Sequence, residues 1–70
     1  MKFPYPRIAK RALDLRIEYL EKELDRLNEE SNFFASEGFE VIALRYDKKA
    51  EKVATELIEL RKERRSLSIT

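Results

Sequence analysis

Two rows of apolar residues, each spaced alternately three and four positions apart, constrain the fold of this 70-residue chain most strongly. The first row consists of Leu13, Ile17, Leu20, Leu24 and Leu27. The second row consists of Phe39, Ala43, Tyr46, Ala50, Val53, Leu57 and Leu60, and its spacing continues to Arg64 and Leu67. On an α-helix this spacing places every member of a row on one face, as in a coiled coil. The sequence therefore predicts two amphipathic helices with matching apolar seams.

The residues that interrupt helices lie outside these rows. Both prolines fall within the first six residues, and the single glycine, Gly38, lies near the start of the second row. Ser36 is the expected N-cap of the second helix, and Phe33 and Phe34 are expected to cover the end of the core. We predict one domain with an extended leader over 1–6, a helix over about 6–31, a turn over about 32–37, a second helix over about 37–66 and a tail over 67–70.

The two seams match in register if the chain folds back on itself. Paired residues of an antiparallel hairpin have numbers that add up to a constant, and Leu27 with Tyr46 gives the same constant as Phe34 with Phe39. That constant places the fold-back point near residue 36, within a cluster of Asn, Ser and Gly. We therefore predict an all-α, coiled-coil-like hairpin of two antiparallel helices. The alternative is one continuous helix of about 60 residues in a parallel coiled coil, because each poor helix former costs only about 1 kcal/mol.

A second set of apolar residues lies off both seams: Ile8, Ala12, Leu15 and Tyr19 in the first helix, and Leu44, Ala54 and Ile58 in the second. A chain this short is below the size at which one core comfortably stabilises a fold. Burying an aliphatic side chain contributes roughly 1.5–3 kcal/mol. We therefore expect a homodimer that forms a four-helix bundle through these residues. A different protein partner, or apolar residues scattered on a surface without a partner, are the alternatives.

Charge is divided unevenly along the chain. Residues 1–16 and 61–70 contain nine basic and two acidic residues, whereas residues 17–60 contain six basic and twelve acidic residues. Because both termini of a hairpin meet at its open end, that end should be basic and could bind nucleic-acid phosphates, an acidic protein or anionic lipid. A solvated charged surface with no partner is the alternative. The candidate binding residues are Arg7, Lys10, Arg11, Arg16, Arg61, Lys62, Arg64 and Arg65.

The composition leaves little for catalysis. The chain has no His and no Cys, so it lacks an imidazole base, a thiolate nucleophile, disulfides and the usual ligands of transition metals. A single Gly leaves no glycine-rich phosphate loop. We therefore predict no catalytic residues, no metal, no cofactor and no small-molecule substrate, and a protein that is not an enzyme.

The location and role follow from the same features. No apolar run approaches the roughly 18 residues of a membrane span, and the first 20 residues lack the apolar core of a secretory signal. We predict a cytoplasmic protein without a membrane partner, with an organelle transit peptide as the alternative. The leading functional prediction is a small adaptor or regulator, of the kind common in bacteria and phages, that binds another protein through its apolar stripe and basic open end. Nucleic-acid binding through the basic end is the alternative, and a structural spacer without a ligand is a third possibility.

Overall fold

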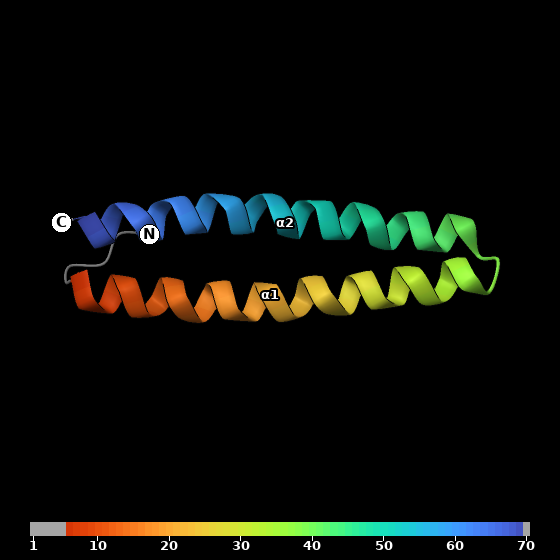
Figure 1. Cartoon of the computed structure of the whole chain (residues 1–70), viewed down its shortest axis with the longest axis horizontal. Helices are drawn as coiled ribbons and strands as arrows, with labels where there is room; N and C mark the ends of the chain where they lie inside the picture. Colours follow the sequence, from red (N-terminus) through yellow and green to blue (C-terminus); the bar gives the residue numbers. More distant parts are fainter. Residues whose placement is uncertain (1–5, 70) are drawn as a thin grey trace.

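The computed structural model describes the backbone of residues 6–69 and the side chains of residues 9–67. Helix α1 (Pro6–Ser36) and helix α2 (Glu40–Ile69) run antiparallel, side by side, and residues 37–39 connect them (Figure 1). Together they form a rod of 49 × 18 × 14 Å, and no strand occurs within residues 6–69. The predicted all-α hairpin is confirmed, and the continuous helix is excluded. Residues 1–5 of the predicted leader lie outside the described residues.

The core lies along the seam between the two helices. Its buried apolar side chains are Ala9, Leu20, Leu27, Ala43, Ala50 and Leu57. All of these except Ala9 belong to the predicted rows, and the remaining residues of the two rows are half-buried with one exception. The exception is Phe39, which precedes α2 and is 54% exposed. Leucines dominate the α1 seam and alanines the first half of the α2 seam, so large and small side chains can alternate across the interface.

Helix α1 continues to Ser36, beyond the predicted end near residue 31. The reason is that Ser31 and Phe34 extend the spacing of the first row toward α2. Ser31 is only 5% exposed, and the ring of Phe34 stacks on that of Tyr46 with centroids 5.5 Å apart. Polar residues cost a helix less than about 1 kcal/mol each, so packing against α2 outweighs their low helix propensity.

Gly38 ends α1 in a Schellman motif. Its φ of 86° lies in the left-handed region, which glycine adopts without steric cost. The Phe39 N–H donates to the Phe34 carbonyl at 2.8 Å, and the Gly38 N–H donates to the Ala35 carbonyl at 3.2 Å. The rings of Phe34 and Phe39 lie edge to face with centroids 6.3 Å apart, which supplies the apolar contact that accompanies this motif.

The start of α2 differs from the prediction. Ser36 is the last residue of α1 and donates its hydroxyl to the Asn32 carbonyl at 2.8 Å, so the predicted N-cap role is wrong. The Phe39 carbonyl accepts the first hydrogen bond of α2, from the Ala43 N–H at 3.0 Å, so a residue without a capping side chain holds that position. Glu40 in the first turn partly compensates, because a carboxylate there interacts favourably with the helix dipole.

The fold-back point and the end of α2 also differ from their predicted positions. The turn centres on Gly38 rather than on residue 36, because α1 continues until the residue that can adopt a positive φ. Helix α2 runs through Ile69, so the predicted tail over 67–70 is helical as far as that residue. This stretch contains no Pro or Gly, the residues that would end the helix earlier.

Candidate binding surfaces

Among the described side chains, three ion pairs join the helices in the half of the hairpin nearest its open end: Arg16 with Glu56 at 3.1 Å, Arg61 with Glu21 at 3.1 Å and Arg64 with Asp14 at 2.8 Å. Their side chains are partly exposed, so each pair contributes at most about 1 kcal/mol. Their main effect is to reduce the positive charge that the hairpin can offer to a binding partner. Three of the eight cations predicted to bind a partner are already partnered by carboxylates of the opposite helix.

Four other predicted cations lie at the open end without a carboxylate partner. Within the described side chains, Lys10, Arg11, Lys62 and Arg65 form no ion pair, and all but the half-buried Lys10 are exposed. The beginning of α1 and the end of α2 lie side by side, so the fold brings these four residues to one end (Figure 1). The side chain of Arg7 lies outside the described ones.

The ion pairs also define two opposite sides of the hairpin. Arg16 and Glu21 are five residues apart on α1, and Glu56 and Arg61 are five residues apart on α2. Five residues correspond to a rotation of about 140° around an α-helix, so the Arg16–Glu56 and Glu21–Arg61 pairs lie on different sides. We call the side with Glu21 and Arg61 the groove side, and the side with Arg16 and Glu56 the stripe side.

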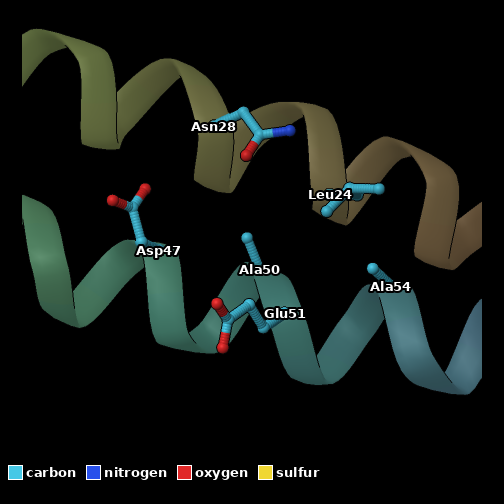
Figure 2. Close-up of a pocket in the computed structure, with 6 residues that line it drawn as sticks. All are labelled: Leu24, Asn28, Asp47, Ala50, Glu51 and Ala54. Atoms are coloured by element: carbon cyan, nitrogen blue, oxygen red, sulfur yellow. The ribbon is translucent and has the colours of Figure 1, made fainter.

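The groove side contains two shallow grooves. One, of about 440 Å³, which we call the central groove, is lined by Leu24 and Asn28 of α1 and by Asp47, Ala50, Glu51 and Ala54 of α2. Figure 2 shows Ala50 and Ala54 pointing toward α1, where their small side chains leave space opposite Leu24 and Asn28. The other groove, of about 460 Å³, lies toward the open end and is lined by Ile17, Arg61, Arg64 and Arg65.

Three predicted interface residues lie on the groove side, because Ala54 lines one groove and Leu44 and Ile58 share its face of α2. Ile58 is 52% exposed and lies one helical turn from Ala54 and from Arg61. Leu44 is 58% exposed and lies one turn before Asp47. Large aliphatic side chains beside open grooves make this side suitable for packing against another helix.

The described interface residues predicted in α1 belong to a different surface. The guanidinium of Arg16 lies 5.6 Å from the centroid of the exposed Tyr19 ring, which places Tyr19 on the stripe side. Leu15, one turn before Tyr19, is 49% exposed, and Ala12 is half-buried. The side chain of Ile8 lies outside the described ones. The described residues of the predicted interface therefore lie on two sides of the hairpin and do not form a single continuous surface.

The closed end carries a third apolar surface, which we call the tip. It consists of Phe33, Phe39 and Val41, which are exposed by 59%, 54% and 67%. Phe34 covers the end of the core, as predicted, but Phe33 packs against it edge to face at 5.3 Å and remains largely exposed. The surrounding segment 27–44 contains four carboxylates and no basic residue.

Ser31 and Asp47 form a polar contact within the seam. The Ser31 hydroxyl lies 2.5 Å from Asp47 Oδ1 and 3.2 Å from the Ala43 carbonyl oxygen, so it can donate to either acceptor. This contact was not predicted from the sequence. The signal was present, because Ser31 follows Leu27 by four residues and precedes Phe34 by three, which continues the seam.

A second polar network lies on the exposed surface near the tip. Arg26 donates to Glu23 and, at 2.8 Å, to Glu30, and these bonds hold the pKa of Arg26 above its usual value. The same bond from Arg26 lowers the pKa of the Glu23 carboxyl. The Tyr46 hydroxyl is hydrogen-bonded to Glu30, which raises the pKa of the phenol. The Lys49 ammonium lies 5.3 Å from the centroid of the Tyr46 ring.

Two kinds of site are not found in the described part of the chain. No three His, Cys, Asp or Glu side chains among residues 9–67 are grouped so that they could hold a metal ion. Neither described helix has a stretch apolar and long enough to cross a membrane.

No protein-family model matches the chain, and no significant match is found among curated proteins or solved structures.

Proposed function

We propose that this chain is a non-catalytic adaptor that binds other helices, first a second copy of itself and then a protein partner. The observation that carries the proposal is the groove side, where Leu44 and Ile58 are more than half exposed beside two grooves. A two-helix hairpin has no second layer of its own to cover these side chains. Covering the exposed half of each side chain would contribute roughly 1–1.5 kcal/mol, about half the value for full burial.

Self-association through the groove side would complete a four-helix bundle. Two hairpins packed in this way would bury Leu44, Ile58 and the two alanines of the central groove in a new core. The hairpin presents a surface 49 Å long and 18 Å wide. Stable complexes bury about 800 Å² of each partner, and a surface of this size can supply that area.

The stripe side would then remain free for a protein partner. Leu15 and Tyr19 lie there, with the guanidinium of Arg16 against the Tyr19 ring. Tyr and Arg are enriched among residues that dominate binding energy at protein interfaces. One surface for self-association and another for a partner would suit an adaptor.

Two double variants test whether the groove side or the stripe side mediates self-association. The double variant Leu44→Glu/Ile58→Glu should be a monomer by light scattering while keeping its helical circular dichroism. Leu15→Glu/Tyr19→Glu adds the same charge to the stripe side and should stay dimeric. If wild type is monomeric at concentrations near 1 mM, self-association is wrong. If the stripe-side variant alone dissociates, the two surfaces have been assigned the wrong way round.

Nucleic-acid binding is a second candidate, supported by the cations at the open end that lack a carboxylate partner. Fluorescence anisotropy with a labelled DNA duplex and a labelled RNA strand tests it. Phosphate binding weakens steeply as salt rises, and Arg11→Ala/Lys62→Ala should weaken it further. Lys48→Ala/Lys52→Ala removes the same charge from the middle of the hairpin and serves as the control. An absence of binding at low salt would exclude this candidate.

A further inference from the structure

The groove side of α2 changes its charge along the helix. Residues spaced alternately three and four apart share a face of a helix, and on this face the acidic residues come first, followed by the basic ones. They are Glu40, Asp47, Glu51, Arg61 and Arg65. Leu44, Ala54 and Ile58 lie between them in the same row. The row therefore begins acidic beside the tip and ends basic at the open end.

The two ends of the hairpin differ in charge in the same direction as this row, with the acidic end at the tip and the basic end at the opening. The tip combines the exposed Phe33, Phe39 and Val41 with a segment, 27–44, that has four carboxylates and no cation. The open end holds cations without a carboxylate partner, among them Arg65, which also lines the groove at that end. Each end thus has the charge that the other end would attract.

We propose that the second copy binds in the antiparallel direction, so that the tip of each hairpin lies against the basic open end of the other. The proposal rests on the self-association proposed above and adds its direction. A two-fold arrangement of this kind satisfies both ends at once and closes the assembly at two copies. A parallel arrangement would instead place the acidic tips of both copies together and the cations of both copies together.

The apolar residues of the row fit the same direction. Leu44 lies toward the tip and Ile58 toward the open end, with the central groove between them. When a second α2 runs the opposite way, the half that contains Leu44 packs against the half that contains Ile58. Both copies then contribute the same contacts, as a two-fold interface requires.

Spin labels at the two ends measure the direction. The chain has no Cys, so a nitroxide can be attached at a single site in Val41→Cys or in Ser66→Cys. A rise of 1.5 Å per residue gives a separation of about 30–40 Å between the two labels of either antiparallel homodimer. A mixture of the two labelled variants should add a separation below about 20 Å, because residue 41 of one copy then lies beside residue 66 of the other.

The outcomes separate this proposal from the one on which it rests. Separations below about 20 Å in each single variant, with no short component added on mixing, would show a parallel dimer. That result would overturn the antiparallel direction and leave self-association intact. A sample without any intermolecular distance would overturn both.

Charge exchange provides an independent measurement. Arg65→Glu and Glu40→Lys should each raise the dimer dissociation constant about tenfold, because each variant opposes like charges in an antiparallel homodimer. An equal mixture of the two should recover the wild-type constant, because every contact in the mixed dimer is again between opposite charges. Lys52→Glu makes the same change as Arg65→Glu in the middle of α2 and should have a smaller effect. Equal effects of Lys52→Glu and Arg65→Glu would overturn the proposal. So would a mixture of Arg65→Glu and Glu40→Lys that fails to recover the wild-type dissociation constant.

Discussion

The hydroxyl of Ser31 on α1 lies 2.5 Å from the Asp47 carboxylate on α2, inside a seam that is otherwise almost entirely apolar. Ser31 is buried, whereas Asp47 reaches solvent. A hydrogen bond to a charged group contributes roughly 1.5–3 kcal/mol, more than one between neutral groups. A single polar contact in a coiled-coil seam also favours one register over its neighbours, because a slip of either helix would leave the buried hydroxyl without this partner.

A double-mutant cycle measures the Ser31–Asp47 contact. Ser31→Ala, Asp47→Ala and the double variant should give a coupling energy of about 1–3 kcal/mol in urea unfolding. The cycle is needed because Ala raises helix propensity at both positions and hides part of the loss in each single variant. A coupling energy indistinguishable from zero would mean that the two side chains do not interact in solution.

Leu57 should be the most sensitive position of the seam. It is 1% exposed, and Leu57→Ala should lower the free energy of unfolding by about 2–5 kcal/mol. Leu15→Ala is the matched control, because it makes the same substitution in a side chain that is 49% exposed, and its effect should be below about 1 kcal/mol. Thermal and urea denaturation check both values. Similar losses in the two variants would contradict the observed core.

Gly38 should be needed for its backbone conformation rather than for space. A Cβ built at this position meets no atom within 4 Å, but φ is 86°. Gly38→Ala should therefore lower the free energy of unfolding by about 1–2 kcal/mol through backbone strain. Gly38→Asn should lose less, because Asn tolerates the left-handed region better. If Ala and Asn were equally harmful, the positive φ would not be the cause.

Tyr46 should give the hairpin a dependence on alkaline pH. Its hydrogen bond to Glu30 raises the pKa of the phenol above its usual value of 10.0 in the folded state. The protonated phenol therefore stabilises the fold below pH 10, and this contribution is lost as the pH rises through the raised folded pKa. The difference in phenolate absorbance between wild type and Tyr46→Phe isolates this titration.

Glu30→Gln provides the control for the Tyr46 titration. It removes the carboxylate that accepts the hydrogen bond, so it should bring the pKa of Tyr46 back toward 10.0. The wild type should also lose more stability at alkaline pH than Tyr46→Phe does. A Tyr46 titration at or below pH 10 in the wild type would contradict the Glu30 contact.

The alternating three-and-four spacing of Leu, Ala and Phe along both halves determined that this chain forms two helices with one seam each. Periodicity is a local property of the chain, so Leu20, Leu27, Ala50 and Leu57 could be identified as core residues before any contact was known. The glycine near the midpoint indicated where the chain turns. The absence of His and Cys, also legible in the sequence, restricted the chemistry available to the molecule.

The tertiary structure decided the features that depend on how the two helices are rotated against each other. Helix α1 passes its predicted end because Phe34 stacks on Tyr46 of α2, a contact that local propensity does not describe. Arg64 is paired with Asp14, fifty residues away in sequence, and a count of charges could not reveal that partnership. Leu15 and Ile58 were expected on one surface, yet they lie on different ones. Which side of a helix faces its neighbour depends on the packing of both helices, and a seam read from one helix does not determine where the outer residues of the other will point.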